Sequence, residues 1–350
     1  MKYKFSLIVP CYNTGRMIER ILGSMLRQNI DLSTLQVILV DDNSTDLSYR
    51  DIAKRYESQF HIDYTKTRNI SVHCPGNTRD AGLPLVDGEW LFFSDHDDYY
   101  TDNVLQTMNQ LIEQFPDKLA ISNVIQVINY ETQQVITKYN HNMTWLHGKF
   151  YNYPNLIQKY NIRFKRDMPT HEDVFFNTSV NARMIELKEQ WLITKLVAYN
   201  WVEQTTSITR QSHEANRGFL YNHFNDYLTS STDPYWHIAI TKQDLQAINQ
   251  IIWTFVNGYF YYMGALFEFR DQVPTKYPTL VPSLKKLFSK IIKKLKLEDK
   301  NLLNFILHHP EEFNRAREAT KIFTGPIIER YSFEEFYYKF KKEIEKGKLA

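Results

Sequence analysis

The sequence has few cysteines and no long apolar run, and both absences limit what the protein can be. Its 350 residues include only Cys11 and Cys74, too few for a disulfide framework and not spaced as a CxxC metal pair. We therefore expect a cytoplasmic protein, because disulfide-poor chains are typical of reducing compartments. No stretch approaches the roughly 18 apolar residues of a transmembrane helix. The short apolar stretch at the N-terminus is expected to be a strand and not a signal peptide.

Strong net charge and the common nucleotide-binding motifs are also lacking. The formal net charge is +2, so nothing global favours a nucleic-acid partner. Neither the G-x-G-x-x-G fingerprint of dinucleotide-binding proteins nor a P-loop is present. The first predicted strand is followed by "PCYNTG", with a single glycine and without the D-x-D of aspartyl phosphatases. A nucleotide, if one binds, is expected to use another kind of site.

What the sequence does contain is an α/β pattern followed by a helical one. We predict strands over residues 5–9, 37–40 and 90–94, and helices over 17–28, 52–60 and 103–114. This alternation favours parallel strands with crossover helices. Further strands are predicted over residues 118–130, 133–139 and 189–204, and residues 144–152 are expected to be a loop that leads into a helix.

Beyond residue 212 the pattern is helical, so we predict two domains, 1–212 and 213–350. Residues 243–269, 283–300 and 332–348 have helical spacing, and the second of these segments is amphipathic. Its apolar face holds Leu284, Leu287, Phe288, Ile291, Ile292 and Leu295, and its polar face holds Lys285, Lys286, Lys290, Lys293, Lys294 and Lys296. Two interpretations stay open: a helix on an anionic membrane surface, or the solvated face of a bundle. The aromatic residues of this part favour homo-oligomer contacts.

Acidic or polar residues directly follow the predicted strands. Ligands of open parallel sheets bind at the carboxyl ends of strands, so Tyr12, Asp42, Asp95 and Asp97 should lie along one rim. The carboxylates of the run "SDHDD" repel one another unless a cation is near, and carboxylate oxygens are ligands that Mg²⁺ and Mn²⁺ prefer. The alternative is a charged, solvated turn. The second acidic strand end, "VDDNSTD", argues against that alternative.

Four segments together resemble family 2 glycosyltransferases of the GT-A fold. They are "SLIVPCYNTGRMIERILGSMLRQ", "VILVDDNSTD", "TRDAGLPLVDGEWLFFSDHDD" and "HEDVFF", and the resemblance covers about residues 4–210. It implies a Rossmann-like α/β domain with a mostly parallel central sheet, here with a C-terminal helical module.

The resemblance also implies a site for the nucleotide of a UDP-sugar donor. Residues that match the segment packing against the uracil base are Pro10, Tyr12 and Asn13. Asp42 matches the carboxylate that accepts a hydrogen bond from the uracil ring, with Asp41 beside it. Arg79 matches a basic residue that reaches toward the diphosphate.

Asp95 and Asp97 match the family's D-x-D motif. The match implies that Asp95 lies near the ribose and the metal and that Asp97 contacts Mn²⁺ or Mg²⁺. Asp98 matches the neighbour that steadies the turn. The sequence departs from the family at His96, where Ser or Ala is common, and at Asp80, where Asn is common. We interpret His96 as a tolerated residue in preference to a ligand, while Asp80 leaves the hydrogen bonding around Arg79 open.

Asp173 in "THEDVFFN" matches the family's catalytic base. Inverting transfer needs a carboxylate to take the proton of the attacking acceptor hydroxyl. Glu172 is expected to orient the acceptor or the start of the helix. The alternative is that both acids only stabilise a helix N-terminus.

Looser similarities suggest further residues of the site. "WLHGKFY" resembles a stretch that shapes the sugar and acceptor pocket, which makes Trp145, His147 and Lys149 candidates for that pocket, each against a structural role. "YNWVEQTTSITRQSH" resembles a segment that closes over the diphosphate, with Arg210 and His213 as the candidates.

The sequence therefore predicts an inverting, metal-dependent hexosyl- or N-acetylhexosaminyltransferase that uses UDP-glucose or UDP-GlcNAc. The expected acceptor is a glycan on a surface polysaccharide, a glycoprotein or a lipid carrier, and peripheral contact with the inner face of the membrane is one option. Two other classes of protein share parts of this pattern. A nucleotidyltransferase would carry a glycine-rich basic loop after the first strand, and a non-catalytic nucleotide-sugar-binding scaffold would have lost the base or the D-x-D.

Overall fold

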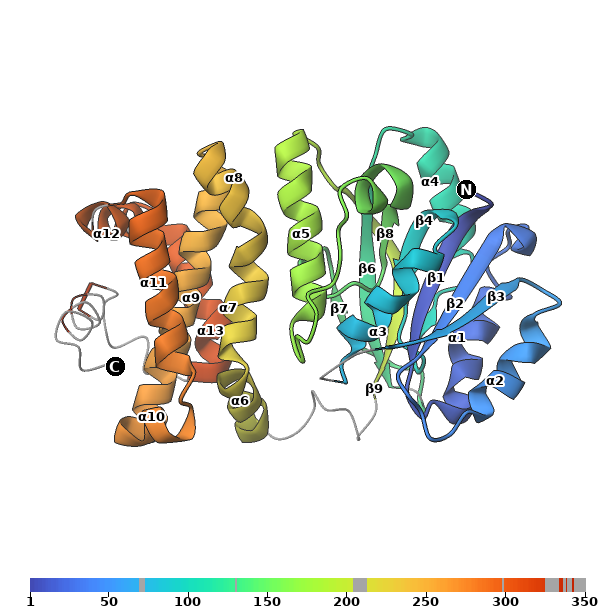
Figure 1. The fold of residues 1–350 in the computed structure, drawn as a ribbon, viewed down its shortest axis with the longest axis horizontal. Coiled ribbons are helices and arrows are strands. Elements are labelled where there is room, and N and C mark those ends of the chain that lie inside the picture. Colours follow the sequence, from blue (N-terminus) through green and yellow to red (C-terminus); the bar gives the residue numbers. More distant parts are fainter. Residues whose placement is uncertain are drawn as a thin grey trace. The chain divides into compact units, whose positions relative to one another are not determined.

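The computed structural model describes residues 1–68, 73–129, 131–203, 213–297 and 299–324, together with residues 334, 335, 338 and 342. The chain divides into two compact units, Met1–Ser207 and Ile208–Ala350. The first unit is α/β and the second is helical (Figure 1).

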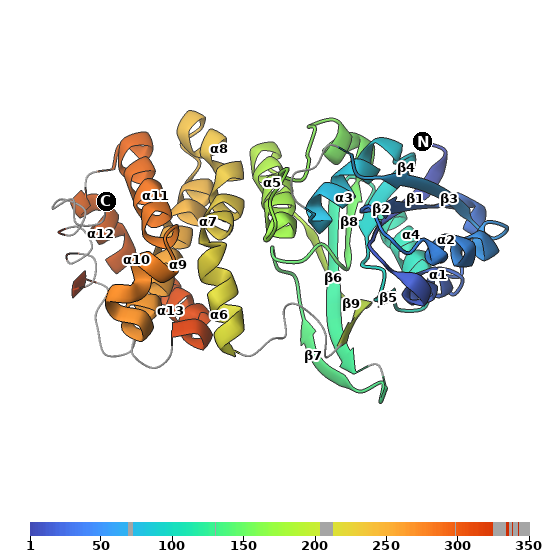
Figure 2. The same ribbon diagram turned by 60° about the horizontal axis from the view of Figure 1, so that its bottom comes forward.

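The first unit is built on one mixed sheet with the strand order β3-β2-β1-β4-β8-β6-β9-β5, and β7 pairs with β6. The strands are β1 (Tyr3–Cys11), β2 (Leu35–Asp41), β3 (His61–Lys66), β4 (Gly88–Phe93), β5 (Tyr99–Tyr100), β6 (Ala120–Asn129), β7 (Val135–Tyr139), β8 (Lys149–Asn152) and β9 (Leu192–Glu203). β3, β2, β1 and β4 run parallel. β8 lies antiparallel between β4 and β6, while β6 and β9 pair in parallel. In Figure 2 the β6–β7 hairpin extends beyond the helices of the first unit.

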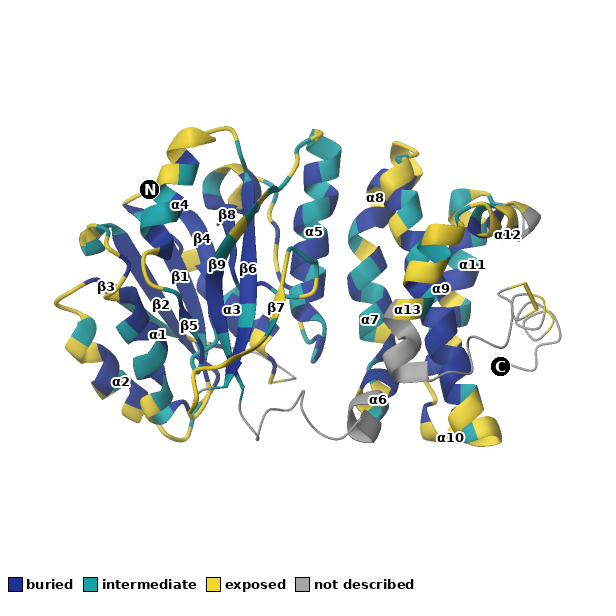
Figure 3. Ribbon diagram, turned by 180° about the vertical axis from the view of Figure 1, so that it is seen from behind, coloured by how far each residue is buried: buried dark blue, intermediate teal, exposed yellow. Residues whose placement is uncertain are grey.

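Helices cover both faces of the sheet, as the predicted crossover connections require. They are α1 (Ile18–Met25), α2 (Ser48–Ala53), α3 (Pro75–Gly82), α4 (Val104–Gln114) and α5 (Glu172–Leu187). Successive side chains of β4 point to opposite faces. Phe92 stacks on Phe150 in the core under α1, α2 and α4, and Phe93 packs edge-on against Phe176 of α5. Both faces of the central strands are buried (Figure 3), so these strands appear in the sequence as continuous apolar runs.

The α/β class predicted from the sequence is confirmed, but several elements differ from the prediction. Residues 149–152, expected in a loop, form β8, because they complete the ladder between β4 and β6. The helix expected over residues 52–60 begins earlier, as α2, and ends in a 3₁₀ turn at Lys54–Tyr56. β3 was not predicted, since its residues are mostly polar and do not form the apolar run of a buried strand.

The second unit packs around one long helix, α9 (Leu245–Phe269), which contacts α7, α8, α11 and α13. The other helices are α6 (His213–Asn222), α7 (Phe224–Thr232), α8 (Trp236–Thr241), α10 (Val273–Lys276), α11 (Leu280–Leu295), α12 (Asp299–Leu307) and α13 (Pro310–Thr324). The helix predicted over residues 332–348 falls largely outside the described residues.

The apolar face of α11 is buried within its own unit, against α7 and α9. That face is therefore not available for a membrane surface. Of the lysines on the opposite face, Lys290 lies near Asp233 and over the ring of Trp236, and Lys286, Lys293, Lys294 and Lys296 are exposed. Among the helices that the structure describes, none is both long enough and apolar enough to cross a membrane.

Candidate functional site

The carboxyl ends of β1, β2 and β4 meet at one edge of the sheet. Cys11 pairs with Asp41 across β1 and β2, and Ile8 pairs with Phe93 across β1 and β4. The loops that carry the candidate residues start at these pairs. His96 joins two of the loops, since its Nδ1 lies 3.2 Å from the carbonyl oxygen of Pro10. A carbonyl can only accept, so Nδ1 carries the proton in this contact.

Asp42 faces a small polar cluster at the end of β2. The carboxylate accepts a hydrogen bond from Thr67 Oγ1 at 2.8 Å, and its other oxygen lies 3.3 Å from His73 Nδ1. The exposed ring of Tyr12 lies 6.3 Å from the His73 ring, centroid to centroid. A base can stack on an aromatic ring of this kind and donate a hydrogen bond to the buried carboxylate beside it. Neither His73 nor Thr67 was predicted, because β3, which precedes both, was not.

Asp41 and Asn13 hold the loops together. Asp41 accepts hydrogen bonds from the backbone amide of Ser44 and from the Tyr49 hydroxyl. The Asn13 side-chain oxygen accepts from the amide of Thr45 at 2.9 Å and from the next amide at 3.1 Å. Their side-chain oxygens are thus directed at the protein, and the predicted contact of Asn13 with a base stays a prediction.

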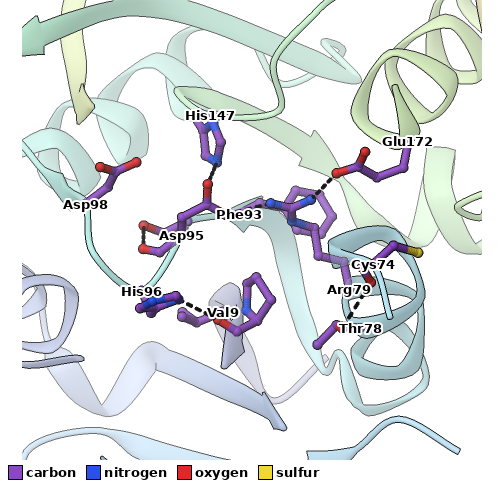
Figure 4. Close-up of polar contacts among 12 residues, drawn as sticks. Val9, Cys74, Thr78, Arg79, Phe93, Asp95, His96, Asp98, His147 and Glu172 are labelled. Carbon is purple, nitrogen blue, oxygen red and sulfur yellow. Dashed lines mark hydrogen bonds and ion pairs between the residues drawn. The ribbon is translucent and has the colours of Figure 1, made fainter. Parts of the chain in front are cut away.

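Arg79 is the central charge of the site (Figure 4). It lies on α3, is 3% exposed, and donates to Asp95 Oδ1 at 2.6 Å and to Glu172 Oε1 at 3.0 Å. Burial alone would lower the pKa of Arg79, but the two carboxylates raise it above its usual value. α3 comes this close to α5 because position 76 is glycine: a Cβ on Gly76 would lie 2.7 Å from the Cβ and Cγ of Glu172.

Asp95 has a second partner on its other oxygen. His147 Nε2 lies 3.4 Å from Asp95 Oδ2, and the His147 ring stacks on Tyr199 of β9 with centroids 4.6 Å apart. Burial raises the pKa of Asp95, but His147 and Arg79 lower it by more, so it lies well below its usual range. The structure thus places His147 beside the D-x-D motif and keeps Asp95 ionised.

The other two carboxylates of the run are held differently. Asp98 is buried and accepts from the Tyr199 hydroxyl at 2.8 Å and from the amide of Val202 at 2.7 Å, so it ties the turn to β9. Burial, with the negative charges of Asp97 and Asp95, raises its pKa well above the usual value. The pKa of Asp97 is also raised, by burial and by Asp95. Its backbone carbonyl accepts from Arg20 at 2.9 Å.

A divalent cation fits the chemistry of this run, although the protein alone does not enclose one. No group of three His, Cys, Asp or Glu side chains is placed to hold a metal in the part of the chain that the structure describes. Mg²⁺ and Mn²⁺ sites of nucleotide enzymes commonly use one or two carboxylates and complete the shell with phosphate oxygens and water. The pKa of Asp97 is raised by burial and by Asp95, so such an ion would favour its ionised form.

Glu172 and Asp173 form the first turn of α5, after His171 in a left-handed conformation (φ 58°). Glu172 is buried against Arg79, while Asp173 is partly exposed and accepts from the amide of Val174 at 2.8 Å. Burial and then the charge of Glu172 raise the pKa of Asp173 to about 8. A carboxyl group with this pKa can accept and release a proton near neutral pH.

Of the remaining predicted residues, Trp145 packs among aromatic rings, Lys149 is buried, and two lie outside the described part of the chain. The Trp145 ring packs between Tyr139 and Trp201, with centroids 4.5 and 5.6 Å away. Lys149, on β8, is 1% exposed and donates to the carbonyl oxygen of Trp145. Arg210 and the side chain of His213 lie outside the described residues.

Asp80 is explained by a partner that the sequence did not reveal. Arg163 binds its two carboxylate oxygens at 2.8 Å each, and the amide of Phe164 donates to one of them. One turn earlier on α3, Asn77 and Asp167 exchange hydrogen bonds of 3.1 and 3.0 Å. The loop that leads into α5 is thereby fixed to the helix that carries Arg79, and Asp80 does not compete for that arginine.

Comparison with known proteins identifies the family. Residues 6–184 match the family described as Glycosyl transferase family 2. The chain belongs to this family. It is 29% identical over 195 residues to the Staphylococcus aureus (strain Mu50) poly(ribitol-phosphate) beta-N-acetylglucosaminyltransferase TarS, covering 53% of this chain and 34% of TarS. A Bacillus spizizenii poly(ribitol-phosphate) beta-glucosyltransferase is 31% identical over 102 residues, which are 29% of this chain and 16% of that enzyme.

The aligned part thus spans about a third or less of the length of these relatives. Among solved structures, residues 1–349 of S. aureus TarS superpose with a TM-score of 0.58 and 18% identity, covering 98% of this chain and 92% of that one. At this identity the likeness concerns the fold. It confirms the predicted GT-A architecture with a C-terminal helical region. The same TarS fragment has been solved with UDP-GlcNAc, at a TM-score of 0.55, 16% identity and the same coverage.

Proposed function

We propose that this protein is an inverting glycosyltransferase that moves a sugar from a UDP-sugar to a hydroxyl of a glycan acceptor. The observation that carries the proposal is the double contact of Arg79. Its guanidinium joins Asp95 of the D-x-D motif to Glu172, the neighbour of the proposed base. The donor half and the acceptor half of the predicted site are therefore one connected cluster of charges.

The proposed roles join the family resemblance to the positions of the residues. Tyr12 and Asp42 bind the uracil base, and Asp95 and Asp97 face the diphosphate. Asp173 takes the proton of the acceptor hydroxyl as its oxygen attacks the anomeric carbon, and UDP leaves with the electrons of the broken bond. A bound Mg²⁺ or Mn²⁺ would supply positive charge to the departing diphosphate. Asp97, with Asp95, would hold it.

The relatives favour particular substrates. TarS and the B. spizizenii enzyme are named for transfer of N-acetylglucosamine and glucose to poly(ribitol phosphate). We therefore propose UDP-GlcNAc or UDP-glucose as the donor and a hydroxyl of a surface glycan polymer as the acceptor. We further propose that the C-terminal helical domain contacts the acceptor or a second copy of the chain.

Calorimetric titration with UDP tests the donor site. We expect UDP to bind the wild type more tightly with Mn²⁺ than with EDTA, and Asp97→Ala to abolish this difference. Asp117→Ala, which removes an exposed carboxylate between α4 and β6, serves as the control. Equal, metal-independent affinity in the wild type and Asp97→Ala would refute the metal assignment.

A UDP-release screen tests transfer. It pairs UDP-GlcNAc, UDP-glucose and UDP-galactose with poly(ribitol phosphate) and with GlcNAc-, Glc- and Gal-terminated acceptors. Asp173→Asn should bind UDP as the wild type does and lose about 10²–10⁴-fold in transfer, the usual contribution of a general base. Full transfer by Asp173→Asn would remove this residue as the base. UDP binding without transfer to any acceptor would indicate a non-catalytic scaffold.

A further inference from the structure

His96 is the residue of the carboxylate run that the proposed mechanism does not use. It stands between Asp95 and Asp97, its ring is partly exposed, and its Nδ1 donates to the carbonyl oxygen of Pro10 at 3.2 Å. In the neutral imidazole the other nitrogen, Nε2, then carries a lone pair and can only accept a hydrogen bond. Within the part of the chain that the structure describes, Nε2 makes no hydrogen bond. A ligand that donates a hydrogen bond can therefore meet this nitrogen.

The loop that carries His96 is held from several sides. The backbone carbonyl of Asp97 accepts from Arg20 at 2.9 Å, and the amide of the residue before His96 donates to the Tyr199 hydroxyl at 3.1 Å. The bond from the ring to Pro10 fixes the direction of the imidazole itself. Because the side chain is already oriented, little conformational entropy would be lost when a ligand binds to Nε2. Such a fixed ring is more than a side chain tolerated in a solvated turn.

The order of the strands places this ring between the two halves of the proposed donor site. β1 lies between β2 and β4, and neighbouring strands are about 4.8 Å apart. Tyr12 and Asp42, the proposed base site, follow β1 and β2, while Asp95 follows β4. His96 belongs to the loop after β4 but reaches back to Pro10 of β1 (Figure 4). In a nucleoside diphosphate the ribose joins the base to the diphosphate, so the ribose should lie over this ring.

A ribose also supplies the kind of group that Nε2 needs. Its 2′ and 3′ hydroxyls can each donate a hydrogen bond, whereas phosphate oxygens and the ionised carboxylates of Asp95 and Asp97 can only accept one. The alternative is that His96 is a third metal ligand. The described residues include no group of three His, Cys, Asp or Glu side chains placed to hold a metal ion, so the geometry favours the ribose.

We propose that His96 recognises the ribose of the donor, with its Nε2 accepting a hydrogen bond from the 2′ or the 3′ hydroxyl. The sequence alone favoured a merely tolerated residue at this position. The proposed contact binds the donor and transfers no proton. This inference rests on the proposed function, because it takes a UDP-sugar as the donor and Tyr12 with Asp42 as its base site.

Calorimetric titration with UDP, 2′-deoxy-UDP and 3′-deoxy-UDP, each with Mn²⁺ and with EDTA, tests the inference. His96→Asn is the informative variant, because the asparagine amide can take the place of Nδ1 and donate to Pro10 while nothing replaces Nε2. We expect it to bind UDP about 3–10-fold more weakly than the wild type, which corresponds to one hydrogen bond. It should bind one of the two deoxy analogues as tightly as the wild type does, with and without Mn²⁺.

Two further variants separate recognition from loop structure. His96→Ala loses both the bond to Pro10 and Nε2, so any loss beyond that of His96→Asn should be shared by UDP and both analogues. His61→Asn is the matched control. His61 is an exposed histidine at the amino end of β3, at the opposite edge of the parallel strands from the site, and its replacement should change none of the affinities.

The outcomes that would overturn the inference are distinct. If His96→Asn weakens UDP and both analogues equally, or weakens none of them, the imidazole does not read the ribose. A loss of affinity confined to titrations with Mn²⁺ would mark His96 as a metal ligand and would also overturn the inference. Failure of the wild type to bind UDP at all would refute the proposed function, and the inference would fall with it.

Discussion

Replacing Gly76 by alanine tests the close approach of α3 and α5 on which the site depends. The new Cβ would lie 2.7 Å from both Cβ and Cγ of Glu172 and 3.8 Å from Phe164 Cδ1. Glu172 is buried and its atoms nearest the helix backbone cannot swing away, so one helix must shift. Overpacking of this kind costs about 1–3 kcal/mol. In a unit of this size that corresponds to a fall of about 2–12 °C in Tm.

The shift should also disturb the chemistry, because Glu172 is bonded to Arg79 and precedes Asp173. A displacement of about 1 Å in a catalytic group can cost on the order of 10²-fold in rate. Differential scanning calorimetry and the UDP-release assay measure the two effects. The control is Gly23→Ala in α1, where the nearest atom to a new Cβ is 3.9 Å away. Alanine there should stabilise by up to about 1 kcal/mol. Wild-type Tm and wild-type transfer in Gly76→Ala would refute the argument that this contact is tight.

Three further predictions concern the same cluster. Arg79→Met should destabilise the protein by about 3–5 kcal/mol in urea unfolding, because two carboxylates lose their buried partner. The stability of Arg79→Lys should lie between those of the wild type and Arg79→Met, because its ammonium cannot bridge both carboxylates. A loss below about 1 kcal/mol in Arg79→Met would contradict the central role of Arg79. Asp173→Asn should have a higher Tm than the wild type at pH 8, and the difference should close toward pH 4. Because the pKa of Asp173 is raised, the folded protein holds a proton that the unfolded chain releases, so the wild type loses stability as the pH rises from about 4 to about 8. Equal Tm values at pH 8 would show that ionisation of Asp173 costs no stability. Asp80→Ala and Arg163→Ala should show a coupling of about 0.5–1 kcal/mol in a double-mutant cycle, as partly exposed ion pairs do; strictly additive losses would mean that the pair does not fix the loop before α5.

The strand ends were predictable from the sequence because their signals are local. The run 90–98 shows an apolar strand that ends in carboxylates, and the rule for parallel sheets places such ends together. Asp98 shows the limit of this approach. Its neighbours in sequence indicate a charged turn, but its partners are Tyr199 and the amide of Val202, on a strand about a hundred residues away.

The partners that decide the electrostatics could not be predicted, since they depend on how distant elements pack. Arg79 was expected to face a diphosphate, and the structure bonds it to Asp95 and Glu172. Lys149 was expected in a pocket, yet β8 inserts between two strands and carries it into the interior. Both outcomes follow from sheet order, which has no signal in the periodicity of a single segment.

The three carboxylates after β4 raise the question of what positive charge allows them to lie together, and the structure gives a divided answer. Asp95 is held by Arg79 with His147 beside it, and Asp98 is held by hydrogen bonds from β9, so two of the three are accommodated by the protein itself. We therefore expect the apoprotein to fold without a metal ion. Burial and the charge of Asp95 raise the pKa of Asp97, so a positive charge beside this carboxylate would favour its ionised form. Because Asp97, with Asp95, would hold a divalent ion beside the diphosphate of the donor, metal affinity and donor affinity should depend on each other.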